Sequence, residues 1–109
     1  MTAQRRPAAP RHLSDEAKAI WKATLPDYDL EVRHLAVLTT ALEALDRMRE
    51  AQEATRRDGA YTEGRFGLKA HPGLAVERDS RTAFLRAQRE LGLDLEAPPT
   101  SRPPTRWRE

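Results

Sequence analysis

The residue types that could carry catalytic or metal chemistry are few in this sequence. Its three histidines, His12, His34 and His71, are too far apart for the i,i+3 or i,i+4 spacing that places two imidazoles on one helix face. The chain has no cysteine to complete a metal site or act as a thiolate nucleophile. The sequence therefore predicts neither a metal site nor a cofactor.

Glycines and carboxylates give no sign of an enzyme either. A phosphate-binding loop needs glycines followed by Lys and then Ser or Thr, and no glycine here is followed by such a pair. Glu77 and Asp79 come nearest to a general acid–base pair. Glu77, however, lies four residues before Arg81, which is the spacing of an exposed ion pair on a helix. We therefore predict a protein without catalytic activity.

Basic residues are concentrated at the two ends of the chain. Residues 1–12 contain Arg5, Arg6 and Arg11 and no acid, and the overall formal charge is only +2. Prolines in residues 1–12 and in residues 97–109 remove the backbone donors that a helix needs. We expect two disordered arms. Their charge suits a polyanion such as DNA, with a merely solvated tail as the alternative.

The C-terminal arm also contains an aromatic residue that no local pattern places in a core. Trp107 lies between Arg106 and Arg108, and Arg102 precedes them. Trp and Arg are common anchors of protein interfaces, and an aromatic ring can also stack on a nucleic-acid base. These four residues are predicted to bind a partner, and an idle tail is the alternative.

The length and composition of the chain limit the folded part between these arms to one small domain. With 109 residues, of which 39% are apolar and 33% charged, the chain can form one small domain, predicted over residues 13–96. No segment approaches the ~20 apolar residues of a membrane span, and the N-terminus lacks the apolar stretch of a secretory signal. We expect a cytoplasmic protein that has no membrane partner.

Capping and breaking residues predict the helices of this domain. Ser14 can cap a first helix that runs to about Leu25, because Pro26 follows. Asp29 can cap a second helix over residues 31–57, a segment with neither Gly nor Pro, and Gly59 ends it. A last helix is expected from about residue 72 to residue 91.

The long second helix has an apolar row with a period of about 3.5 residues, which indicates a helical partner. A domain with so few aromatic residues is expected to rely on self-association for part of its stability. The row is therefore predicted to join copies of the chain, and its members are Leu35, Leu38, Leu42, Leu45 and Met48.

Residues 60–70 contain two glycines and β-prone side chains, which predicts a small β-hairpin or loop with Tyr61 and Phe66 on its packing face. The predicted fold is mostly all-α. A short N-terminal helix lies across one end of a long antiparallel helical hairpin, with the β-hairpin or loop at the other end and a basic arm at each terminus.

Four segments, taken in order, resemble the small terminase subunits of tailed bacteriophages and prophages. They cover residues 9 to about 95, so the Pro-rich tail lies outside the resemblance. The segments are APRHLSDEA at 9–17, LAVL at 35–38 with LEALDR at 42–47, YT at 61–62 with RFG at 65–67, and HP at 71–72 with ERD at 77–79, Phe84 and ELGL at 90–93.

The resemblance implies a non-enzymatic DNA-packaging factor that forms a ring in the infected cell. It implies binding to double-stranded viral DNA at the packaging start and recruitment or regulation of a large subunit that carries ATPase and nuclease. The apolar row then serves assembly, and DNA contacts fall to the arginines at the ends, namely Arg5, Arg6, Arg11, Arg56 and Arg57. A clean helix-turn-helix motif is not evident. The alternatives are a small helical adaptor or transcription-associated protein that binds a protein partner, and a nuclease accessory factor or enzyme.

Overall fold

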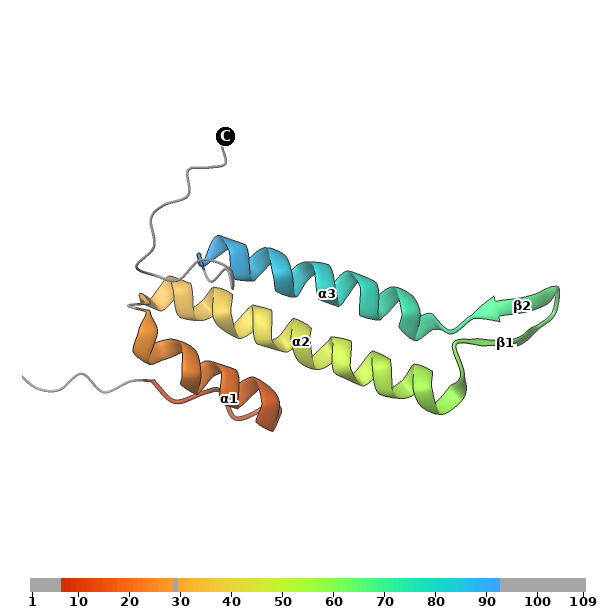
Figure 1. Ribbon diagram of the computed structural model, residues 1–109, viewed down its shortest axis with the longest axis horizontal. Coiled ribbons are helices and arrows are strands. Elements are labelled where there is room, and N and C mark those ends of the chain that lie inside the picture. The colour runs from red at the N-terminus through yellow and green to blue at the C-terminus, as the bar shows by residue number, and fades with distance from the viewer. Residues whose placement is uncertain (1–6, 29, 93–109) are drawn as a thin grey trace, which may run out of the picture.

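The computed structural model describes residues 7–28 and 30–92, and its architecture is mostly helical (Figure 1). Residues 1–6 of the predicted arm 1–12 and all of the predicted tail 97–109 lie outside the described residues. The mostly α-helical fold is confirmed. In chain order the elements are α1 (Asp15–Thr24), the 3-10 turn η1 (Leu25–Asp27), α2 (Val32–Asp58), β1 (Tyr61–Gly64), β2 (Gly67–Ala70) and α3 (Pro72–Glu90).

The helices are arranged around α2. Helices α2 and α3 run antiparallel along most of their length, and the strands β1 and β2 extend beyond them as a ribbon (Figure 1). Helix α1 packs along the first half of α2. No helix among the described residues is long and apolar enough to span a membrane.

Polar caps begin the first two helices. The Ser14 hydroxyl oxygen accepts from the backbone N–H of Ala17 at 3.1 Å, as predicted for the start of α1. Helix α2 is capped by Glu31 and not by Asp29, the predicted residue. The backbone N–H of Glu31 has no partner within the helix, and it donates to Nδ1 of His34 in the first turn at 3.2 Å.

The core lies between all three helices. Leu38 and Leu42 are fully buried, and Leu45 and Met48 continue the same row along α2. Trp21 of α1 and Phe84 of α3 pack against this row. The predicted apolar row therefore finds its partner helices within its own chain.

The ribbon is a two-stranded antiparallel sheet in which Tyr61 pairs with Ala70 and Gly64 with Gly67. Tyr61 is 63% exposed and Phe66 is 94% exposed. The prediction that these two residues form a packing face is therefore wrong. The ribbon extends past the helix ends, so the described part of the chain contains no surface that could cover them (Figure 1).

His71 connects the end of α2 to the start of α3. Its Nδ1 accepts from the backbone N–H of Gly73 at 2.8 Å, and its Nε2 lies 3.0 Å from a carboxylate oxygen of Asp58. These hydrogen bonds require the tautomer that carries its proton on Nε2. The bond from His71, together with that from Arg57, lowers the pKa of Asp58 below its usual value.

Candidate nucleic-acid interface

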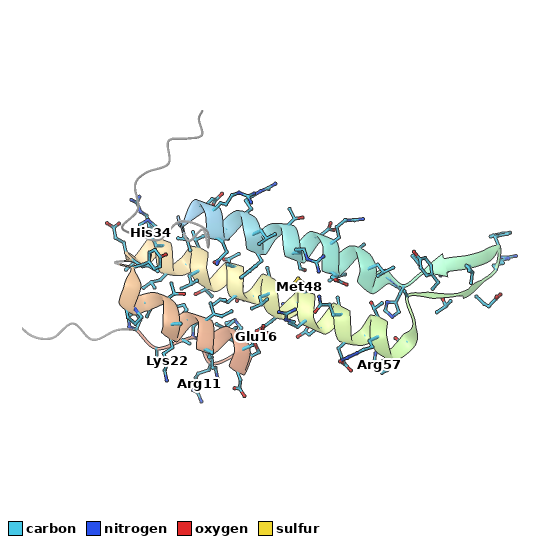
Figure 2. All side chains as sticks on the ribbon, viewed as in Figure 1. Arg11, Glu16, Lys22, His34, Met48 and Arg57 are labelled. Carbon is cyan, nitrogen blue, oxygen red and sulfur yellow. The ribbon has the colours of Figure 1, made fainter. Side chains whose placement is uncertain are left out.

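The arginines predicted to bind DNA are not brought together by the fold. Arg5 and Arg6 lie outside the described residues. Arg11 is exposed just before α1, whereas Arg56 and Arg57 are in the last turn of α2, at the other end of that helix (Figure 2). Arg56 pairs with Glu53, and Arg57 pairs with Asp58 at 3.1 Å. The two α2 arginines therefore already have carboxylate partners.

A basic surface that the sequence analysis missed runs along one side of α1. Lys18 and Lys22 are one turn apart and flank the buried Ala17 and Trp21; Lys22 is exposed and Lys18 is half-buried. None of the described carboxylates forms an ion pair with Lys18, Lys22 or the nearby Arg11. Figure 2 shows Arg11 and Lys22 at the same edge of the molecule. We call Arg11, Lys18 and Lys22 the α1 basic face. In the sequence, the i,i+4 spacing of Lys18 and Lys22 was the signal that could have identified this surface.

Other basic side chains form ion pairs or hydrogen bonds between α1 or the segment before it and α2. Arg49 of α2 donates two hydrogen bonds to the Glu16 carboxylate of α1, each 3.0 Å long. The hydrogen bond to Glu16 raises the pKa of Arg49 above its ordinary value. On the same side His12 lies 2.7 Å from Glu43. These contacts orient α1, and with it the α1 basic face.

The two carboxylates that come nearest to an acid–base pair, Glu77 and Asp79, have structural partners. Glu77 accepts from Arg81 at 2.8 Å and from Gln52 of α2 at 3.2 Å. The Arg81 and Gln52 hydrogen bonds lower the pKa of Glu77. The predicted ion pair between Glu77 and Arg81 is confirmed, and Asp79 pairs with Arg78. Glu77 therefore links α3 to α2.

The residues predicted to join copies are found in the core of one chain. Leu38, Leu42, Leu45 and Met48 are buried there, and Leu35 is partly buried against them. A role in assembly stays a prediction, but any copy meeting this folded chain would touch other side chains. The residues predicted to bind a partner, Arg102, Arg106, Trp107 and Arg108, lie outside the described residues.

A shallow apolar groove lies where the start of α2 meets the end of α3. Its volume is about 360 Å³. Ala36, Thr40 and Ala83 form part of its wall, and Arg86 and Glu90 lie along it. We call this the α2/α3 groove. The small side chains of its wall leave the space between the two helices open.

Comparison with known proteins agrees with this helical architecture. A family model described as the small subunit of phage terminase matches residues 17–102, from α1 through α3 and beyond. Neither a curated protein nor a solved structure matches the chain. The family takes part in packaging phage DNA and is generally without catalytic activity. Because the match covers most of the sequence, this chain belongs to the phage terminase small subunit family.

Proposed function

We propose that this chain is the DNA-recognition component of a phage packaging machine. In this role it assembles into a ring, binds double-stranded viral DNA at the packaging start and recruits or regulates the large subunit that carries ATPase and nuclease. It does so in the cytoplasm of the infected cell and performs no catalysis itself. The observation that carries the proposal is the family match over residues 17–102.

The α1 basic face supports the DNA-binding part of the proposal. Its three cations have no carboxylate partner among the described residues, so they can neutralise phosphates without first breaking an ion pair. Each phosphate contact releases counterions and is weak alone. A ring repeats the face around its circumference, and simultaneous contacts then give avidity.

The triple variant Arg11→Gln/Lys18→Gln/Lys22→Gln is expected to lose at least about tenfold of its DNA affinity at about 0.1 M salt. The slope of log affinity against log salt should become shallower, because fewer counterions are released. Fluorescence anisotropy with DNA that spans the packaging start measures both quantities. A second variant that lacks residues 1–6 tests Arg5 and Arg6 while keeping Pro7, which contacts Trp21.

The matched control is Arg56→Gln/Arg57→Gln, which removes cations that are already paired. An unchanged affinity and slope for the triple variant, with a large loss for this control, would place the DNA contact at the end of α2. DNA binding that is absent in the wild-type chain, together with no effect on the large subunit, would contradict the proposed function and favour a helical adaptor.

The C-terminal tail is proposed to contact the large subunit. Its four prolines limit the conformations available to the free chain, so less entropy is lost when it docks. Removing residues 97–109 should leave helicity and native mass unchanged but should remove most of the stimulation of the large subunit's ATPase. Trp107→Ala alone should reproduce much of that loss, whereas Thr105→Ala serves as a control. Full stimulation by the truncated chain would refute this role.

A further inference from the structure

The tip of the ribbon presents an apolar knob to solvent. Phe66 is 94% exposed and Leu68 is 71% exposed, and Tyr61 is on the same ribbon. The Arg65 guanidinium lies 5.5 Å from the centre of the Phe66 ring. Large apolar side chains gathered on a projecting element are typical of a surface that another molecule covers.

The α2/α3 groove is a matching socket on the same chain. It is apolar, its small side chains permit close approach, and its 360 Å³ volume can accept an aromatic ring. Both surfaces also carry charged side chains. Arg86 and Glu90 line the groove, and Glu63, Arg65 and Lys69 belong to the ribbon. None of these five groups forms an ion pair within the described residues, so both signs are available on both surfaces.

The knob and the groove lie at opposite ends of the helical hairpin. The ribbon connects the end of α2 to the start of α3, whereas the groove lies between the start of α2 and the end of α3 (Figure 1). One chain therefore cannot fill its own groove with its own ribbon. A second copy can, and it leaves its own groove free for a third.

We infer that the ribbon tip of one copy, centred on Phe66, docks in the α2/α3 groove of the next copy. This contact uses two different surfaces, so it is heterologous, and it produces a closed ring when the rotation between copies closes. The inference rests on the ring assembly proposed above and identifies the surfaces that form it. It also explains how copies associate although the Leu38–Met48 row is buried within each chain.

A single contact of this kind is smaller than a typical stable interface, and a ring compensates by repeating it. A stable interface buries about 800 Å² per partner. Phe66 at the tip contributes on the order of 150–250 Å² when buried, and Leu68 and the stems of the neighbouring charged side chains add to this. In a closed ring every copy makes two such contacts, so a modest single contact is sufficient.

The test uses one variant for each surface. Phe66→Asp removes the knob, and Ala83→Arg fills the groove; both positions are exposed, so each chain should keep its helical circular dichroism. Native mass spectrometry at tens of micromolar should show a wild-type assembly larger than a dimer and each variant as a monomer. An equimolar mixture of the two variants should form a heterodimer that grows no further, because one knob and one groove remain intact.

Matched controls are Thr62→Asp on the ribbon and Thr82→Arg beside Ala83 on α3, both of which should keep the wild-type mass. Variants that retain the wild-type mass, or a mixture that stays monomeric, would overturn this contact while leaving ring assembly standing. A monomeric wild-type chain would refute the ring itself. Loss of DNA binding or of ATPase stimulation by Phe66→Asp at unchanged mass would assign the tip to another partner and also overturn the inference.

Discussion

Replacing Leu42 by Asp is expected to unfold the chain, and not merely to separate its copies. Leu42 is fully buried in the core formed by the three helices. An Asp there loses hydration with no compensating partner, whether ionised or protonated, and also leaves the cavity of the lost Leu. The combined loss is a large part of the roughly 5–15 kcal/mol by which small domains are stable. Circular dichroism should show most of the helical signal lost at 25 °C.

Two further variants separate burial from a role between copies. Leu42→Ala should lower the free energy of unfolding by about 2–5 kcal/mol and leave the chain folded. Leu85→Asp, at a side chain that is 46% exposed on α3, should change stability little. A folded, helical monomer of Leu42→Asp would contradict this interpretation and return the apolar row to contacts between copies.

Trp21→Ala should cost about 3–5 kcal/mol of stability, the second largest effect we expect. Trp21 is 5% exposed and is the largest side chain that α1 places in the core. Its indole N–H also donates to the backbone carbonyl of Pro7 at 2.9 Å, which holds the segment before α1 in place. The variant loses both the packing and this tether.

Trp21→Phe divides the effect into its two parts. Phe keeps most of the ring but cannot donate, so the hydrogen bond should account for about 1 kcal/mol of the loss. Urea unfolding followed by circular dichroism measures both variants on one scale. Equal losses for Ala and Phe would show that the tether to Pro7 outweighs the packing of the ring.

Local signals in the sequence were sufficient to predict the helices. Ser14 and Gly59 mark helix ends through short-range hydrogen bonding and backbone freedom, and neither depends on the rest of the fold. The extent of α2 was predicted to within one residue, but its N-cap was not, because Asp is a more common N-cap than Glu. Glu31 is the N-cap in the structure, and its backbone N–H donates a hydrogen bond to the His34 ring.

The surfaces were harder to predict because they depend on which elements meet. An apolar row with a period of 3.5 residues requires helical partners but does not show whether they come from the same chain. Here α1 and α3 supply them. Phe66 was misplaced because an apolar residue in a β-prone segment usually packs inward, and no local pattern shows that the ribbon extends past the helices. The i,i+4 spacing of Lys18 and Lys22 could have predicted that they share one side of a helix. The α2/α3 groove could not be predicted in this way, because residues from two distant segments form it.

The way in which α1 is attached has a consequence for the order of folding. Helices α2 and α3 are joined by a short ribbon, so their contacts close a small loop and can form early. Helix α1 packs mainly on α2 and is held there by Trp21, Ser14 and Glu16. Because α1 has its main contacts with one helix, we expect it to open before the α2–α3 hairpin does. Local opening, seen as faster amide hydrogen exchange, is therefore expected to begin in α1 and to reach the α2–α3 hairpin only later.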